Sequence, residues 1–342
     1  MNYLILNVAG IGDFFELIRW IYLTKKQKPD VNIDLLVSDR VYNYAKKCPY
    51  VRNVFYLKTR KNYVSIWNAD LFKIIKKIRE NYYDVVLNTH GVYSLSGHIK
   101  MLLFLKFLRF KKSIGLKTDF LNYYDEYIED DFKKSYYFYY SLLFNKIGVF
   151  DEDVNYNEII WYGNDIELKI KENLKNFEGK KIILINPFTN VPSKKFDNYK
   201  WRELINFLIK NEKHIIFLIG TKEFLLELKE ILANLNSSNI IGLNDLSFVE
   251  WILYIKHSDI VISVDSATYH IASLLGKKVI LLLGSTNFER GKSYNNNFVY
   301  AISKKVFCSP CDKYRCPNKG EDYMICVKKI GVEDIIRTFN EI

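Results

Sequence analysis

The residues best suited to bind an anion lie in the second half of the chain. Residues 260–264 are mostly apolar and rich in β-branched side chains, which is typical of a strand buried on both faces of a parallel sheet. Asp265, Ser266 and Thr268 follow at once, where a helix over 269–275 must begin. Small acidic and hydroxyl residues accept hydrogen bonds from the unpaired amides of a helix N-terminus, and the same helix end attracts phosphate. The segment therefore predicts a phosphate-binding turn.

A second polar turn follows the next expected strand. Gly276 ends the helix, residues 279–283 form another apolar run, and Gly284-Ser285-Thr286 comes after it. Parallel strands present their carboxyl ends at one edge of a sheet, where doubly wound folds bind their ligands. Two such junctions in succession predict a nucleotide-phosphate cleft.

A glycine turn near the N-terminus carries a carboxylate. Residues 3–8 are expected to form a strand, and Gly10, Gly12 and Asp13 follow it. The turn lacks the third glycine of a dinucleotide-binding motif and the Gly-Lys-Ser/Thr of a P-loop. Two interpretations of Asp13 stay open. It is either a helix N-cap or a functional carboxylate at the carboxyl end of a strand.

Strands and helices alternate in both halves of the chain, which is typical of doubly wound α/β folds. In the first half we expect strands at 3–8, 32–37, 54–57 and 84–88, and helices at 13–24, 71–80 and 97–108. Residues 119–150, rich in acidic and aromatic side chains, are expected to form helix and loop. In the second half we expect strands at 181–186, 214–219, 239–243, 260–264 and 279–283, and helices at 201–211, 224–235, 247–256 and 269–275.

Length and composition indicate a folded protein of two domains. At 342 residues the chain is about two domains long, and a hydrophobic fraction of 49% argues against disorder. We expect an N-terminal domain over 1–160, a C-terminal domain over 161–330 and a final helix over 331–342, with a change of composition at 151–180 as the linker.

The charge of the chain favours anionic partners. The net charge of +11 suits nucleotides and phospholipid or lipopolysaccharide surfaces. The basic residues are dispersed among acids and match no nucleic-acid-binding motif, so no nucleic-acid partner is expected. No apolar run reaches the length of about 18 residues that a transmembrane helix needs. The start has no basic region and runs into a glycine turn, so it predicts a first strand rather than a signal peptide. We expect a cytoplasmic protein.

Three motifs in register resemble glycosyltransferase family 9, the ADP-heptose:lipopolysaccharide heptosyltransferases and their relatives. They are Gly10-Ile11-Gly12-Asp13, Lys194 seven residues before Trp201, and the run Ser-Val-Asp-Ser-Ala-Thr-Tyr-His at 263–270. The resemblance covers residues 3 to about 330. It implies the GT-B fold, two Rossmann-like domains facing each other across a cleft, with the acceptor on the N-terminal domain and the nucleotide-sugar on the C-terminal one. It also implies inverting transfer of heptose from an ADP-sugar, with no cofactor or metal for catalysis.

The resemblance implies roles for single residues. Asp13 resembles the general base that deprotonates the acceptor hydroxyl, a task that inverting transfer requires. Lys194 resembles the lysine that stabilises the departing diphosphate, and neighbouring Lys195 could equally fill that role. Glu223 resembles the acidic residue that binds the donor ribose. The full set expected to bind the donor is Gly12, Thr189, Lys194, Lys195, Gly220, Glu223, Asp265, Ser266, Ala267, Thr268 and His270.

Structural interpretations of these positions remain open beside the functional ones. Lys194 could be a solvated loop charge, and Glu223 an ordinary exposed residue at a helix start. His270, which resembles the histidine after the family's donor loop, could serve packing alone.

Three positions depart from the family pattern. Glu16 stands where heptosyltransferase I members carry a histidine, Ala267 replaces the glycine of the donor loop, and Arg202 replaces the proline after the tryptophan. These differences bear on the acceptor and on the donor sugar rather than on the fold.

Four of the five cysteines form a cluster with the spacing Cys-x2-Cys-x4-Cys-x9-Cys. They are Cys308, Cys311, Cys316 and Cys326. In a cytosolic protein such a cluster predicts a metal site more readily than disulfides. Four thiolates would bind zinc, or iron, in a closed structural site; reduced or partly disulfide-bonded cysteines are the alternative. A similar cluster occurs in many family 9 members and resembles the iron-binding finger of the protein-modifying heptosyltransferases.

The basic, apolar stretch from Lys100 to Lys112 allows two interpretations. It is either a helix lying on the anionic inner membrane, where a lipid-linked acceptor would be presented, or a core helix with a solvated stripe. We therefore expect an enzyme that moves heptose or a related sugar from an ADP-sugar to a lipid-linked lipopolysaccharide or lipooligosaccharide core. The alternatives are a related enzyme with a protein acceptor such as an autotransporter, and a non-catalytic nucleotide-sugar-binding protein.

Overall fold

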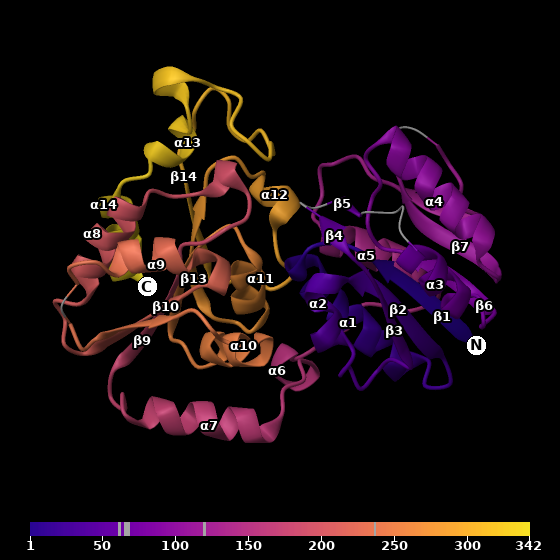
Figure 1. The fold of residues 1–342 in the computed structure, drawn as a ribbon, viewed down its shortest axis with the longest axis horizontal. Coiled ribbons are helices and arrows are strands. Elements are labelled where there is room, and N and C mark those ends of the chain that lie inside the picture. The colour runs from indigo at the N-terminus through magenta and orange to yellow at the C-terminus, as the bar shows by residue number, and fades with distance from the viewer. Residues whose placement is uncertain (61–62, 65–68, 119–120, 236) are drawn as a thin grey trace. The chain divides into compact units, whose positions relative to one another are not determined.

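The chain divides into two compact units, residues 1–161 and 162–342 (Figure 1). The computed structural model describes all residues except 61–62, 65–68, 119–120 and 236. Each unit contains a six-stranded sheet. A short antiparallel pair, β4 (Thr59–Arg60) and β5 (Tyr63–Val64), also belongs to the first unit.

The sheet of the first unit is parallel throughout, with the strand order β3-β2-β1-β6-β7-β8. Its strands are β1 (Asn2–Asn7), β2 (Asn32–Ser38), β3 (Asn53–Leu57), β6 (Tyr83–Asn88), β7 (Phe110–Lys117) and β8 (Glu126–Glu129). The strand order reverses between β1 and β6, and such a switch point is where doubly wound folds place ligands.

Helices cover both faces of the first sheet, because successive side chains along β1 point to opposite faces. Leu4 and Leu6 join a core that includes Leu105, on one helix of the unit. Asn7, on the opposite face of the strand, contacts Tyr140 on another helix. The helices of the unit are α1 (Ile11–Gln27), α2 (Asp39–Ala45), α3 (Ala69–Ile78), α4 (Leu95–Phe107), α5 (Tyr136–Asn145) and α6 (Tyr156–Ile159). Leu105 lies on α4 and Tyr140 on α5.

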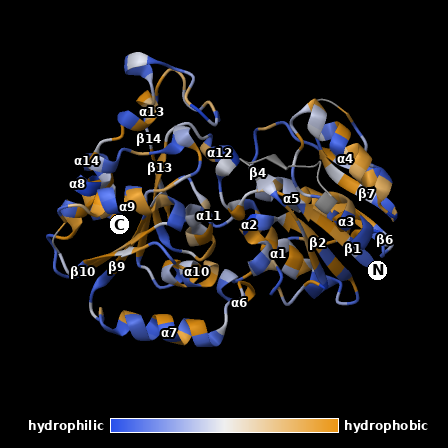
Figure 2. Cartoon of the chain, in the orientation of Figure 1, coloured by the Kyte–Doolittle hydropathy of each residue, from blue (hydrophilic) through white to orange (hydrophobic). Residues whose placement is uncertain are grey.

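The sheet of the second unit repeats this topology, with the parallel order β11-β10-β9-β12-β13-β14. Its strands are β9 (Lys181–Asn186), β10 (His214–Ile219), β11 (Ile240–Leu243), β12 (Ile260–Val264), β13 (Lys278–Leu283) and β14 (Val299–Ser303). The switch point lies between β9 and β12. Figure 2 shows that hydrophobic residues concentrate on the strands of both sheets.

The helices of the second unit alternate with these strands. They are α7 (Asn164–Lys175), α8 (Asn198–Leu208), α9 (Leu225–Leu232), α10 (Phe248–Lys256), α11 (Ala267–Leu274), α12 (Phe288–Gly291), α13 (Ile325–Lys328) and α14 (Val332–Glu341), with 3-10 turns η1 (Pro192–Lys194), η2 (Lys222–Phe224) and η3 (Gly320–Asp322). Among the residues that the structure describes, no helix is long and apolar enough to cross a membrane.

The predicted α/β class is confirmed, and three strands, β9, β10 and β12, have the predicted bounds. Within the two six-stranded sheets, β7, β8 and β14 were not predicted, and neither was the short pair of β4 and β5. The expectation of helix and loop over 119–150 is wrong in part, because β8 lies within it and pairs with β7. Lysines interrupt β7, and a glutamate stands at each end of the four-residue β8, so neither strand has the apolar run of a central strand.

Candidate active site

An ion pair with a buried carboxylate lies at the switch point of the second unit. Asp265 follows the last residue of β12, and its Oδ2 accepts hydrogen bonds from Lys194 Nζ at 2.5 Å and from the Thr286 hydroxyl at 2.6 Å. Lys194 ends η1, in the loop after β9, and Thr286 lies in the turn after β13. Three loops from three adjacent strands therefore meet on one carboxylate.

The charges around Asp265 keep it ionised. Burial alone would raise the pKa of this carboxyl, but the nearby charges of Lys194 and His270 and the hydrogen bonds from Lys194 and Thr286 outweigh the loss of water. The net effect lowers the pKa of Asp265 below its ordinary value. The switch point therefore holds one buried negative charge and, beside it, a partly exposed ammonium group.

Asn186, which the sequence analysis did not single out, organises the predicted donor loop. It ends β9, and its Nδ2 donates to Thr268 Oγ1 at 2.5 Å and to Ser266 Oγ at 3.2 Å. Its Oδ1 accepts from the Phe188 amide at 3.2 Å. The only sequence signal for it was a polar residue that ends an apolar strand just before Pro187. This side chain ties the loop after β9 to the start of α11.

The start of α11 differs from the expected capped helix. Ser266 is the N-cap residue, but its side chain makes no capping bond to α11 in the described structure and lies 3.1 Å from Ser263 Oγ instead. Thr268 is fully buried and its hydroxyl accepts the bond from Asn186. His270 is half-buried with its ring against Tyr269. The backbone amides at the first turn, rather than these hydroxyls, are the groups suited to bind an anion.

The structure separates the two candidate lysines. Lys194 Nζ contacts Asp265, whereas Lys195 Nζ forms an ion pair with Glu227 on α9 at 2.8 Å. Only Lys194 therefore lies at the predicted donor loop. Thr189 is buried in the loop between β9 and η1. Its hydroxyl accepts a hydrogen bond from the Val191 amide at 3.2 Å, so this side chain stabilises the turn that leads to η1.

Gly220 and Glu223 follow β10 along the chain. A Cβ atom at Gly220 would lie 2.7 Å from the Phe188 ring, so this glycine is required for packing in the described structure. Glu223 is exposed on η2. Gly12, the remaining residue of the predicted donor set, is buried in the first turn of α1 and belongs to the first unit.

The cysteine-rich segment, residues 308–326, forms hydrogen bonds with η1 and with the turn after β13. The Ser193 hydroxyl of η1 donates to the Lys313 carbonyl at 2.5 Å and lies 3.0 Å from the Ser285 hydroxyl. The amides of Cys311 and Asp312 donate to the Ser285 carbonyl at 3.0 and 2.8 Å. The segment therefore contacts both η1, which carries the candidate lysine, and the turn after β13.

The four clustered cysteines are free thiols that lie near one another. Burial raises the pKa of Cys326, and the charges of Cys308, Cys311 and Cys316 raise it further. Within the described ranges, no group of three or more His, Cys, Asp or Glu side chains has an arrangement that could hold a metal ion. Metal binding would therefore require these thiols to move closer together.

In the first unit, Asp13 caps α1 but not as its N-cap residue. The helix begins at Ile11, two residues before the predicted start, so Gly10 is the N-cap and Asp13 stands in the first turn. Asp13 Oδ2 accepts a hydrogen bond from the Gly10 amide at 2.9 Å. This bond satisfies an amide at the helix start and fixes the carboxylate at the carboxyl edge of the sheet.

A polar network beside Asp13 links β1, β6 and α5. Asn7 Nδ2 donates to the Thr89 hydroxyl at 2.9 Å and to the Tyr140 hydroxyl at 3.2 Å. The Tyr140 hydroxyl lies 3.4 Å from the Asp13 carbonyl. Burial and then the charge of Asp13 raise the pKa of Tyr140 well above its ordinary value. None of the three supporting side chains was predicted from the sequence.

The pKa of Asp265 leads to a prediction on stability. A lowered pKa in the folded state means that the ionised carboxylate stabilises the fold above the unfolded pKa of about 3.9, and that this contribution is lost as pH falls through the folded pKa. Asp265→Asn should therefore lower the free energy of unfolding by about 2 kcal/mol at pH 7, between the values for exposed and fully buried ion pairs.

The difference between wild type and Asp265→Asn should shrink as pH falls below about 4, because the wild-type carboxyl is then protonated as well. Urea unfolding at several pH values measures it. A difference that stays constant between pH 7 and the acid limit would contradict the ionised state assigned to Asp265.

Comparisons with known proteins identify the family of this chain. The profile of glycosyltransferase family 9 (heptosyltransferase) matches residues 71–321. Lipopolysaccharide heptosyltransferase 1 of Campylobacter coli is 24% identical, over 100% of this chain and 99% of that protein.

Two solved structures share the fold. The glycosyl transferase family 9 protein of Veillonella parvula has a TM-score of 0.77 at 12% identity, over 99% of this chain and 96% of that one. The Escherichia coli heptosyltransferase WaaC, solved with ADP, has a TM-score of 0.73 at 15% identity, over 100% and 99%. These likenesses confirm the GT-B fold class with its two Rossmann-like sheets. The chain is a glycosyltransferase and belongs to family 9, the heptosyltransferase family.

Proposed function

We propose that this enzyme transfers heptose or a related sugar from an ADP-sugar to a lipid-linked lipopolysaccharide core, with inversion and without a catalytic metal. The observation that carries the proposal is the charged switch point of the second unit, where Lys194 is held on the buried carboxylate of Asp265. The names of its relatives support the sugar and the acceptor: one is a lipopolysaccharide heptosyltransferase, and another was solved with ADP.

On the donor side, Lys194 stabilises the diphosphate. An ammonium group has three donors, so Lys194 can bind a phosphate oxygen while Asp265 still holds it. Its charge offsets the negative charge that develops on the departing nucleotide diphosphate, which is the task of a fixed electrostatic group in the transition state. The free amides at the start of α11 add a second site for phosphate oxygens. Ala267, the first residue of α11, replaces the glycine of the family's donor loop, which is why a related sugar stays beside heptose in the proposal.

On the acceptor side, Asp13 is the general base. The Gly10 amide orients its carboxylate through Oδ2, and the network of Asn7, Thr89 and Tyr140 supports the strand ends beside it. The carboxylate removes the proton of the acceptor hydroxyl as the oxygen attacks the anomeric carbon of the donor. The C–O bond to the diphosphate breaks, and the nucleotide leaves as a diphosphate.

Two substitutions at Asp13 separate catalysis from helix capping. Asp13→Asn keeps an oxygen that can accept from Gly10 N–H but loses the basic group, so kcat should fall about 10²-fold or more while the affinity for ADP stays unchanged. Asp13→Ala should lose the same activity and, in addition, about 1 kcal/mol of stability. Steady-state kinetics and thermal unfolding measure the two effects. Full activity in Asp13→Asn would show that the residue is only a cap.

Lys194 and Lys195 provide a matched pair for the donor site. Lys194→Met should weaken ADP binding by about tenfold or more, because it removes a charge-assisted hydrogen bond to phosphate. Lys195→Met should change the affinity by less than about twofold, since Lys195 pairs with Glu227 instead. Calorimetric titration with ADP compares the two, and thermal unfolding checks that Lys194→Met, which leaves Asp265 unpaired, is still folded. A larger loss in Lys195→Met would reverse the assignment.

We propose further that the four clustered cysteines bind a structural zinc or iron ion. The donor set supports this, because soft thiolates select these metals. Binding would draw together a segment that contacts η1 and the turn after β13. Cys326 would contribute a buried thiolate.

Metal analysis tests this second proposal. The purified wild-type protein should carry about one zinc or iron per chain, and Cys311→Ser should lose it. Cys48→Ala serves as the control, because Cys48 is buried elsewhere and burial raises the pKa of its thiol to about 12. A wild-type protein that stays metal-free after zinc addition would overturn the proposal.

The proposed lipid-linked acceptor also places the enzyme at a membrane surface. Leu95, Ile99, Leu103 and Phe107 recur every fourth residue along α4, and all four are exposed. An exposed apolar stripe with basic neighbours is typical of helices that lie on anionic lipid. We propose that α4 makes this contact.

A further inference from the structure

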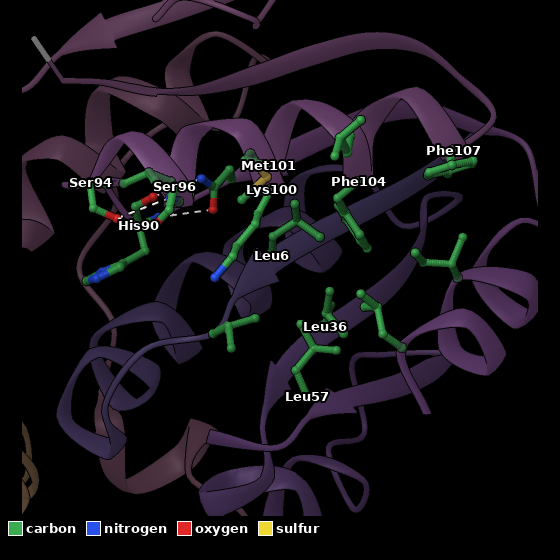
Figure 3. A pocket seen from close by; sticks show the side chains of 18 of the residues that line it. Leu6, Leu36, Leu57, His90, Ser94, Ser96, Lys100, Met101, Phe104 and Phe107 are labelled. Atoms are coloured by element: carbon green, nitrogen blue, oxygen red, sulfur yellow. Dashed lines mark hydrogen bonds between the residues drawn. The ribbon is translucent and has the colours of Figure 1, made fainter. Parts of the chain in front are cut away.

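The first unit contains an elongated cavity that the chemistry above does not use. It has a volume of about 570 Å³ and lies between α3, α4 and the sheet (Figure 3). A volume in this range is typical of sites for small molecules. Its walls are mostly apolar, with Leu6 and Leu36 from the sheet facing Phe104 from α4.

The two ends of the cavity differ in polarity. Figure 3 shows His90, Ser94 and Ser96 gathered at one end, and Phe104 and Phe107 toward the other. From Ser96 to Phe107 the lining follows α4 for about 16 Å, at 1.5 Å per residue. A long apolar cavity with one polar end suits an amphiphile with a single extended chain.

Lys100 brings a positive charge to this cavity. Its side chain extends from α4 into the space near the polar end, and it is half-buried (Figure 3). Within the described part of the chain, no carboxylate forms an ion pair with it. Lys106, six residues further along the same helix, is exposed and is not among the residues that line the cavity. The charge at the polar end would suit an anionic head group.

Three large apolar side chains that line the cavity are also exposed at the protein surface. Phe72 on α3 and Leu103 and Phe107 on α4 line the cavity and are 59%, 39% and 46% exposed. Exposed large apolar side chains grouped at a hollow mark sites of interaction rather than ordinary surface. A chain entering from a lipid phase would meet these side chains first.

The cavity also reaches the edge of the sheet where Asp13 lies. Val8 and Asn88, which line it, stand at the carboxyl ends of β1 and β6. Val8 is two residues before Gly10, the residue that holds the Asp13 carboxylate. A lipid whose chain filled the cavity would therefore present its polar part at the predicted acceptor edge.

We infer that this cavity binds one acyl chain of the lipid-linked acceptor, with an anionic group of the lipid near Lys100. This inference rests on the proposed function, because it assigns the lipid part of the same acceptor. It distinguishes a defined site for one chain from the adsorption of the α4 stripe to a membrane surface.

Calorimetric titration with alkyl phosphates below their micellar concentration tests the site directly. Dodecyl phosphate should bind to the full-length wild-type protein with one molecule per chain, and octyl phosphate more weakly, by about tenfold for each two methylene groups removed. Met101 on α4 lines the cavity, and Met101→Trp, which fills it, should weaken dodecyl phosphate binding by about tenfold or more. Leu103→Trp at the rim provides a second filling variant in case the first is unstable. Leu226→Trp, at an 81% exposed position in the other unit, should have no effect.

A matched pair of lysine substitutions on α4 tests the role of the Lys100 charge. Lys100→Met should weaken the binding of dodecyl phosphate but not that of uncharged dodecyl maltoside, whereas Lys106→Met should change neither. Binding that does not depend on chain length, or that persists unchanged in both filling variants, would overturn the inference. Equal loss in Lys100→Met and Lys106→Met would show adsorption to the surface of α4 rather than a site.

Kinetics with two acceptors separate this inference from the proposed function. The wild-type enzyme should have a lower KM for a fully acylated core lipid than for the same core with its chains removed, and Met101→Trp should abolish the preference without changing kcat on the deacylated acceptor. Transfer to both acceptors with equal KM would contradict the acyl-chain site and leave the proposed function standing. Transfer to neither would contradict the proposed function, and alkyl phosphate binding would then test the cavity alone.

Discussion

The ion pair between Asp265 and Lys194 is the interaction on which the second unit's site depends. A buried carboxylate is costly unless charges and hydrogen bonds compensate for the lost water. Lys194 and Thr286 supply that compensation from two different loops. These loops follow β9 and β13, the two strands that flank β12 in the sheet. One carboxylate at the end of β12 therefore joins both loops and fixes the position of the Lys194 ammonium group.

In the first unit, too, a carboxylate at the end of a strand is held by hydrogen bonds, but the groups differ. There the carboxylate of Asp13 is held by a backbone amide, and Asn7 joins the neighbouring strand ends to α5. Both sites lie at switch points because parallel strands end at one edge and helix starts converge there. The cavity beside α4 reaches the same edge through Val8 and Asn88, so the proposed acceptor site and the inferred acyl-chain site would share these strand ends.

The sequence predicted those parts of the fold that local pattern determines. The β-branched runs of β9, β10 and β12 gave correct bounds because they are buried on both faces. β8 was missed because glutamates flank its only two apolar residues, Tyr127 and Ile128, and because the strand is ordered by pairing with β7. Long-range pairing of this kind leaves little trace in a short segment.

In the candidate site, too, the sequence predicted what local motifs determine and missed what depends on contacts between distant residues. Motif spacing located Asp265 and Lys194, but adjacency in sequence could not separate Lys194 from Lys195, since only the fold directs one to Asp265 and the other to Glu227. Asn186 was missed because a single polar residue at a strand end is common. Its role depends on Thr268, 82 residues away in the chain.

The selectivity of the enzyme for the nucleotide of its sugar donor tests most directly the claim that it transfers a sugar from an ADP-sugar. Calorimetric titration of the wild-type protein with ADP-, UDP- and GDP-sugars compares the nucleotides under one set of conditions. The proposed function predicts that the ADP-sugar binds selectively, with the other two at least about tenfold weaker. Equal binding of all three, or no binding of the ADP-sugar, would contradict it.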